Sequence, residues 1–378
     1  MNKQVLSTLS VLALAAVATP AVADFKFGDD ERNVTVYGRI DLGIVRENRG
    51  ESYLNQGGGS LATGKTQMHP GADSWFGVNA EMMLDDGFKS YLKVQQRFRA
   101  DTGAELNSAS QFHGWSYIGL QKIGFGAIEL GRQYMPAAYI ALNADPFRWD
   151  TVANISNMSL GYAKGSLGSG YTASDGPRYK NGVIFKSDRI NGFQASLGAS
   201  LKQENTLSTP AVAGKSGVGS EYGATVEYIS GPLYAGIGYD HTSSNPNVPA
   251  ANLTTGQNLT IGTVAYDFGV IKPMASAAVT RVGVAGGTLE AKAMSLGAIA
   301  PIGSKGELKG LAARVSQDGP GAQDLTKYGI GYHHFLKRVR TDKESYFTKV
   351  YIDAATARGT NPDLTRTNAI DVGVMVAF

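Results

Sequence analysis

The sequence predicts an all-β protein, a 16-stranded antiparallel transmembrane β-barrel. First, segments of alternating apolar and polar residues recur along the chain, and successive side chains of a strand point to opposite faces. Second, short turns and long polar loops separate these segments in alternation, an asymmetry typical of membrane barrels. Third, basic residues share one face of several segments, and a membrane barrel can hold them only against water.

The amino-terminal residues 1–23 are predicted to form a secretory signal peptide. Lys3 supplies a short positive region, the stretch Val5–Val17 is mostly Leu, Val and Ala, and Ala21–Ala23 is a small-x-small cleavage site. No other stretch reaches the ~18 apolar residues that a membrane helix needs. Residues 24–378 contain no linker or shift in composition, so we expect them to form one barrel domain.

The composition excludes several classes of protein. The chain has no cysteine, so closed strand pairing in lipid must supply the stability that disulfides give many secreted proteins. The net charge of +3 gives no indication of a nucleic-acid partner. Five histidines lack the spacing of metal ligands, and no nucleophile is marked by a neighbouring base. We therefore expect no enzyme, no metal site and no cofactor.

Seven short connections contain the Gly, Asp, Asn and Pro residues that tight turns require. Eight longer loops rich in Gly, Ser, Asn and Thr alternate with them, which gives sixteen strands. The short connections are Asp85–Gly87, Lys122–Phe125, Ser187–Gly192, Ser230–Pro232, Asp267–Gly269, Pro301–Ser304 and a longer basic one at Leu336–Lys343.

The first three strand segments divide their residues between a lipid face and an inner face. A cation on the lipid face costs about 2–4 kcal/mol at the membrane midplane, so a ladder of cations on one strand must line water. Arg39, Lys93 and Arg97 then form a basic wall near mid-height. The charged residues with inward parity are Arg39 and Asp41 on the first segment, Glu81 on the second, and Lys89, Lys93, Arg97 and Arg99 on the third.

Arg132 departs from simple alternation, because it shares the parity of the outward residue Leu130. We expect Gly131 to kink or bulge this strand and to turn Arg132 inward, as glycine often does in strands. On the next strand three basic residues share the inward parity and extend the lining: Arg178, Lys180 and Lys186.

The last segment, residues 368–378, alternates almost perfectly and ends on an aromatic residue, Phe378. A closed barrel can use such a strand, because its last strand must pair with its first to remove the exposed edge.

Several stretches form an ordered set of motifs along the mature chain: Val34–Asp41, Leu84–Lys89, Gly126–Gln133, Asn181–Phe185, Gly192–Phe193, Ala265–Gly269 and the terminal Phe378. In this order they resemble the general trimeric porins of Gram-negative bacteria, in particular the betaproteobacterial type. Two stretches depart from the family pattern. Residues 75–80 lack two expected basic residues, and the loop motif Pro-Glu-Phe is replaced by Asp145–Phe147.

The resemblance implies a homotrimer in outer-membrane lipid, recognised by the barrel-assembly machinery through the carboxy-terminal strand and Phe378. It also implies that Arg132 lines the pore and that an inward-folded third loop, residues 135–177, narrows it. Asp145 and Asp150 of this loop would then face the basic wall. Alternatively, they cap the loop's own backbone, as short Asp side chains readily do.

The expected function is a passive, water-filled outer-membrane channel for small hydrophilic solutes and ions. Rings of basic side chains favour anions, while Asp41, Glu81 and the loop acids oppose them, so the predicted anion preference is moderate. Two alternatives stay open. One is a channel selective for a particular anion, such as phosphate or an organic acid, and the other is a barrel-based adhesin.

Overall fold

The structure, a computed structural model, describes residues 25–48, 66–69, 71–106, 111–155, 158, 177–201, 221–242, 256–284, 286–340, 345–360 and 366–378. The expected signal peptide, residues 1–23, and residues 159–176 of the expected inward loop lie outside these ranges. Within them, no helix is both long and apolar enough to cross a membrane.

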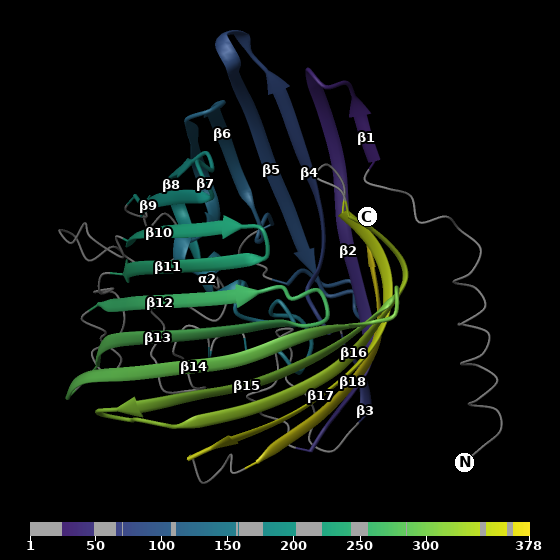
Figure 1. Cartoon of the computed structure of the whole chain (residues 1–378), viewed down its shortest axis with the longest axis vertical. Helices are drawn as coiled ribbons and strands as arrows, with labels where there is room; N and C mark the ends of the chain where they lie inside the picture. Colours follow the sequence, from purple (N-terminus) through teal and green to yellow (C-terminus); the bar gives the residue numbers. More distant parts are fainter. Residues whose placement is uncertain are drawn as a thin grey trace.

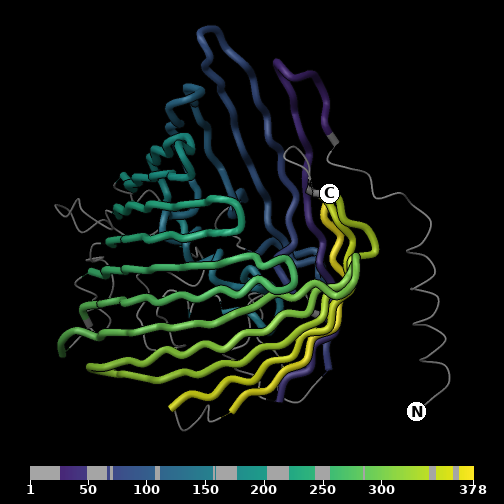
Figure 2. The backbone as a smooth tube through the Cα atoms, viewed as in Figure 1, coloured from purple at the N-terminus to yellow at the C-terminus, as the bar shows by residue number. Residues whose placement is uncertain are grey.

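In the described part of the chain, sixteen antiparallel strands form one closed barrel, which confirms the predicted fold class (Figures 1 and 2). The ring closes where β18 pairs with β2, and the yellow β18 accordingly lies beside the purple β2 in Figure 1. The barrel strands are β2 (Arg32–Glu47), β4 (Ser74–Met83), β5 (Phe88–Phe98), β6 (Ser116–Lys122), β7 (Gly126–Tyr134), β8 (Arg178–Ser187), β9 (Phe193–Ser200), β10 (Glu221–Ser230), β11 (Leu233–Thr242), β12 (Gln257–Tyr266), β13 (Lys272–Val284), β14 (Gly287–Ile302), β15 (Gly306–Asp318), β16 (Leu325–Arg340), β17 (Ser345–Gly359) and β18 (Thr367–Ala377).

Two short strands, β1 (Phe25–Gly28) and β3 (Thr66–His69), pair with opposite ends of β2. A single 3₁₀ turn, η1 (Asp85–Gly87), joins β4 to β5. Asp86 has φ of 56° there, the left-handed conformation that Asp tolerates better than most residues.

Alternation along the strands separates an apolar outer face from the inner face. On β18, Val372 and Val374 are 48% and 45% exposed, whereas Asp371 and Met375 on either side of them are fully buried. An apolar outer face is what a barrel presents to lipid. Because the ring is closed, its backbone donors and acceptors pair between strands and none needs water.

The connections at one end of the barrel are short, as predicted, and six of them occur where the sequence indicated. The seventh was expected at Leu336–Lys343, but β16 continues to Arg340 and β17 begins at Ser345. At the other end, the expectation of eight long loops is wrong. The connections after β13, β15 and β17 cover only residues 285–286, 319–324 and 360–366. The reason is that strands β13 to β17 continue well beyond the ~10 residues needed to span lipid, so residues assigned to loops belong to strands.

The chain after β7 turns into the barrel, where α2 (Pro136–Leu142) lies against the inner faces of β9 to β12 (Figure 1). The Thr263 hydroxyl of β12 donates a hydrogen bond of 3.0 Å to the carbonyl of Ile140. A Cβ at Gly236 would lie only 2.7 Å from the Ile140 side chain, so this glycine makes room for the helix. Residues 135–155 therefore form the described part of the predicted inward loop.

The hydrophobic core lies between this inward loop and one half of the barrel wall. The inner faces of these strands carry apolar residues where a pore lining would carry polar ones. Alternation shows which residues face inward, but it does not show that another segment covers them. The loop contributes Ile140, Phe147, Val152 and Ile155 among others. The wall contributes Leu259, Ile261, Ala278, Ala291, Ala293, Ala313, Val315, Leu325 and Ala355.

Candidate functional site

Three side chains lie in one row across the inner wall of β2, β4 and β5. In the strand registers, Arg39 is opposite Trp75 and Trp75 is opposite Arg97. The guanidinium carbons of Arg39 and Arg97 lie 3.7 and 5.6 Å from the centre of the Trp75 ring. Cations at such distances are attracted to the face of an indole. The structure thus brings together two arginines predicted from sequence, through an aromatic residue between them.

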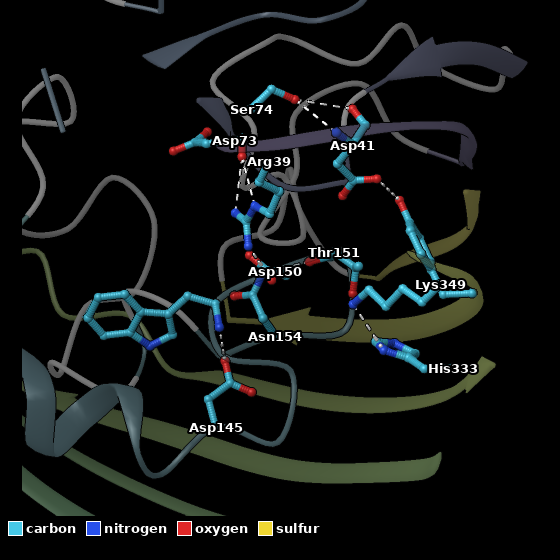
Figure 3. Close-up of polar contacts among 12 residues, drawn as sticks. Arg39, Asp41, Asp73, Ser74, Asp145, Asp150, Thr151, Asn154, His333 and Lys349 are labelled. Carbon is cyan, nitrogen blue, oxygen red and sulfur yellow. Dashed lines mark hydrogen bonds and ion pairs between the residues drawn. The ribbon is translucent and has the colours of Figure 1, made fainter. Parts of the chain in front are cut away.

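The two loop acids do different things, so each of the two alternatives holds for one of them. Asp150 accepts a hydrogen bond of 2.8 Å from Nη1 of Arg39 and so faces the basic wall (Figure 3). Asp145 is buried and accepts three bonds of 2.9 to 3.0 Å from the backbone N–H groups of Phe147, Trp149 and Ile155. Burial raises the pKa of the Asp145 carboxyl above its usual range, and the three donors oppose that shift.

Asp73, in the short segment before β4, is a member of the site that the sequence reasoning missed. Its Oδ2 is 2.6 Å from Nη1 of Arg97, and its carbonyl accepts bonds of 3.2 and 3.0 Å from Nε and Nη2 of Arg39 (Figure 3). The signal was present, because Asp73 is two residues from the inward-facing Trp75.

Lys89 and Lys93 continue the wall along β5 toward the short connections. Nζ of Lys89 is 3.6 Å from Oε1 of Glu81. Nζ of Lys93 lies 4.9 Å from the centre of the Tyr37 ring and 5.7 Å from that of Trp115. Arg99, just past the end of β5, donates its backbone N–H to the carbonyl of Ala104 at 2.8 Å.

The expected irregularity at Gly131 is present. The pairing of β7 with β8 shifts register between Gly131 and Gln133, and Gly131 has φ of 133°, a conformation that favours glycine. Arg132 is buried beside this bulge, and its Nε donates a bond of 2.9 Å to the carbonyl of His113.

On β8, Arg178 donates a bond of 3.1 Å from Nη2 to the hydroxyl of Tyr134. Lys180 is half-buried, and its carbonyl accepts a bond from the Ser200 hydroxyl. Asn181 has φ of 51°, so simple alternation does not extend from Lys180 to the rest of the strand. The shared parity assumed for the three basic residues of this strand is therefore interrupted.

Glu129 is a second acid that the sequence reasoning did not assign. Its Oε2 is 2.6 Å from Nζ of Lys186, and its Oε1 accepts a bond of 2.8 Å from the hydroxyl of Tyr91. Glu129 lies between Ile128 and Leu130, which are 51% and 46% exposed on the outer face. Alternation was therefore sufficient to place it inside.

Asp41 faces inward but is fully buried, which differs from the expectation of an acid lining the pore. It accepts a bond of 2.8 Å from the Tyr351 hydroxyl, and its backbone N–H donates to the Ser74 hydroxyl at 3.0 Å (Figure 3). Asp41 is buried because residues 71–74 lie over it on the inner side of the wall, where Ala72 packs against Tyr351.

Further buried polar groups on β16 and β17 also escaped the sequence reasoning. Nε2 of His333 lies 3.1 Å from both carboxylate oxygens of Asp353, and Nδ1 of His333 lies 3.2 Å from Nζ of Lys349. His334 is on the opposite face, because adjacent residues of a strand point to opposite sides, and its Nδ1 lies 3.2 Å from the Tyr332 hydroxyl. In the described ranges, no three His, Cys, Asp or Glu side chains are arranged to hold a metal ion.

Phe378 lies just past the end of β18 and is joined to the first barrel strand. Its backbone N–H and carbonyl exchange bonds of 2.9 and 2.7 Å with Gly38. A Cβ at Gly38 would be 2.6 Å from the Phe378 ring, so this glycine leaves space for the aromatic side chain.

Comparison with known proteins gives consistent results. A family model described as Gram-negative porin matches residues 9–361. An outer membrane porin of Bordetella pertussis is 24% identical over 273 residues, which are 68% of this chain and 66% of the relative. Outer membrane porin protein 32 of Delftia acidovorans is 24% identical over 342 residues, 87% of this chain and 86% of the relative.

Among solved structures, an anion-selective porin from Comamonas acidovorans has the same fold. The TM-score is 0.73 at 22% sequence identity, and the match covers 92% of this chain and 100% of that chain.

Proposed function

Because the chain belongs to the Gram-negative porin family, we propose that the diffusion channel it forms in the outer membrane has a moderate preference for anions. Small hydrophilic solutes pass through water inside the barrel without an energy source. The described fold relative from Comamonas acidovorans is an anion-selective porin, which supports the same sign of preference here.

The observation that carries this proposal is the charge balance on the inner wall of β2 and β4 to β8. Rings of basic side chains favour anions, and acids beside them weaken the effect. Among the side chains whose contacts are given above, and with the buried Asp41 and Asp145 left out, cations outnumber acids by seven to four. The cations are Arg39, Lys89, Lys93, Arg97, Arg132, Arg178 and Lys186, and the acids are Asp73, Glu81, Glu129 and Asp150.

The reversal potential of the purified protein in a planar bilayer, under a potassium chloride gradient, tests the proposal. We expect the sign of an anion-selective channel and a value well short of ideal selectivity. The sign of a cation-selective channel would contradict the anion preference and leave the channel intact. Folded protein without conductance would contradict the channel itself.

We also propose that the chain assembles as a homotrimer. A fold relative, OmpT of Vibrio cholerae, is described in a trimer form, with a TM-score of 0.63 to this chain. The apolar outer face of the barrel suits both lipid and a subunit interface. Light scattering of the detergent-solubilised protein should give three times the mass of one chain, and the mass of one chain would contradict the proposal.

Phe378 is the proposed recognition residue for the barrel-assembly machinery. Its pairing with Gly38 at the closing seam supports a role in completing the barrel. Removal of Phe378 should lower the amount assembled in the outer membrane of cells while refolding in detergent continues. Equal amounts in cells would contradict this role.

A further inference from the structure

We propose that the basic wall contains a track for flat carboxylate anions, in which aromatic rings and cations alternate. The track would favour solutes such as benzoate over aliphatic carboxylates of the same charge and similar size. This inference rests on the anion-preferring channel proposed above and names a class of solute for it.

The aromatic part of the track is a continuous series of rings on β5, β6 and β7. The ring centres are 6.4 Å apart between Tyr91 and Tyr117, 6.3 Å between Tyr117 and Trp115, and 4.6 Å between Trp115 and Tyr134. Each pair meets edge to face, with interplanar angles of 81° to 89°. The series rises from the short-connection end of β5 to the place where the chain enters the inward loop.

The series continues onto the inward loop itself. The centre of the Tyr134 ring is 5.7 Å from that of Tyr139 and 6.0 Å from that of Trp149. The chain has only three tryptophans, and all of them, Trp75, Trp115 and Trp149, belong to this wall or to the loop segment that faces it. Aromatic residues thus connect the wall to the loop.

Cations stand against the rings along the whole series. Nζ of Lys93 lies 5.7 Å from the centre of the Trp115 ring, the guanidinium carbon of Arg178 is 4.4 Å from that of Tyr134, and Nζ of Lys186 is 5.4 Å from that of Tyr139. Lys186 already pairs with Glu129, and Arg178 already bonds to Tyr134. A solute carboxylate drawn to Lys93 therefore brings the rest of its solute against the Trp115 ring. The residues Trp115, Tyr117 and Tyr134 are half-buried, so each keeps some exposed surface.

The chemistry distinguishes a flat anion from other solutes. An aliphatic carboxylate is attracted to the cations but has no ring to stack, and a neutral sugar contacts the rings but carries no charge to attract the cations. Edge-to-face or offset contacts between aromatic rings favour binding by about 2- to 12-fold beyond the buried area. On the opposite half of the wall, Lys309 and Lys349 also lie beside aromatic rings, but both lysines are buried, and the apolar residues around them are covered by the inward loop.

Half-blocking concentrations of single-channel current test the track. Sodium benzoate and sodium cyclohexanecarboxylate, which carry the same charge on rings of different shape, are added to the full-length mature protein in a planar bilayer. We expect benzoate to block at a concentration about 2- to 12-fold lower. Equal half-blocking concentrations, or stronger block by glucose than by benzoate, would overturn the proposal.

A substitution ties the difference to these rings. Trp115→Leu should bring the two half-blocking concentrations together. Tyr328→Leu, which removes an aromatic residue from the outer face where Tyr328 is 57% exposed, should preserve the difference. A difference that persists in Trp115→Leu would overturn the track, and the wild-type comparison stands alone if that variant does not fold.

The reversal potential in potassium chloride, measured on the same wild-type channels, separates the two proposals. An anion-selective potential with equal half-blocking concentrations removes the track and keeps the proposed anion preference. A cation-selective potential removes the anion preference, on which the track depends.

Discussion

The two halves of the inner wall are built from the same alternating strands but contact different surroundings. On β2 and β4 to β8, the inner residues are arginines, lysines, acids and aromatics, and many of them are half-buried. On β12 to β17, toward the ends opposite the short connections, the inner residues are mostly Ala, Val, Leu and Ile. These residues pack against the inward loop. We propose that the first half lines water, whereas the second serves as the floor of a hydrophobic core.

The difference shows that a residue's place in the alternating pattern determines whether its side chain points inward or outward. The pattern does not determine which groups that side chain contacts. Lys93 and Ala293 both face inward, on β5 and β14, yet Lys93 contacts aromatic rings of the open wall and Ala293 is buried in the core. Small residues on β14 to β17 leave the volume that the loop occupies. Gly329 and Gly331 of β16 do this most clearly, because a Cβ at either would contact Ala153 or Phe147.

The largest effect should come from placing the same charge on each half. Ala293→Asp buries a carboxylate in the apolar core, which costs several kcal/mol when the charge has no partner. We expect this variant to fold poorly or to release the inward loop. Denaturant unfolding in detergent, followed by tryptophan fluorescence, measures the loss.

Asn79→Asp is the matched control, because Asn79 faces inward opposite Lys93 in the strand register. The new charge there has a cationic neighbour and should change the free energy of unfolding by about 0.5 kcal/mol or less. Equal losses in the two variants would contradict the distinction between the halves.

Phe147→Ala should weaken the contact between the loop and its floor. Phe147 is 2% exposed and packs beside Gly331 and His333, so truncation should cost about 3 kcal/mol. A loosened loop should also increase the single-channel conductance. Phe268→Ala, at a turn where Phe268 is 61% exposed, should leave both quantities nearly unchanged. An unaltered free energy of unfolding in Phe147→Ala would show that the loop is held by other contacts.

The double variant Arg39→Ala, Arg97→Ala should reduce the anion preference. Removal of two cations from one row lets Asp73 and Asp150 act without neutralising partners. A unit charge about 4 Å from an ion contributes on the order of 1 kcal/mol in water, so the chloride-to-potassium permeability ratio should fall about 5-fold. Lys292→Ala, on the outer face with its side chain 64% exposed, should not change it. An unchanged ratio in the double variant would remove these arginines from the selectivity mechanism.

The smallest effect should separate the two loop acids. Asp150→Asn removes a charge that faces Arg39 and should raise the permeability ratio for chloride by about 2-fold, because salt screens a single charge. Asp145→Asn should leave the ratio unchanged and lower the free energy of unfolding by about 1–3 kcal/mol, since it disturbs three backbone hydrogen bonds. The reverse assignment of the two effects would contradict the geometry of the loop.

The strand number, the short connections and the inward direction of Arg39, Lys93 and Arg97 followed from alternation and turn residues. These features are local, and period-two patterns report them directly. The bulge at Gly131 was also accessible, because a basic residue with lipid-facing parity demands an irregularity in the strand. The lengths of strands β13 to β17 were underestimated. No residue pattern marks where a strand leaves the membrane and continues into the space outside it.

The features that could not be predicted depend on contacts between segments far apart in the chain. Asp41 is buried because residues 71–74 cross over it and Tyr351 reaches it from β17. The choice between the roles of Asp145 and Asp150 depends on how the loop backbone folds over its own carboxylate. Neither relation produces a pattern along the sequence: the first arises from the closed shape that brings β2, β4 and β17 together, and the second from the conformation of the loop.

The central claim, that one half of the inner wall lines water and the other is covered, can be tested by cysteine accessibility. The chain has no cysteine of its own, so Asn79→Cys and Ala293→Cys each introduce a single thiol, and a charged water-soluble thiol reagent is applied to the folded protein in membranes. We expect rapid reaction at position 79. At position 293 the reaction should be roughly 100-fold slower, because access there requires local opening that costs a few kcal/mol. Equal reaction rates at the two positions would contradict the account.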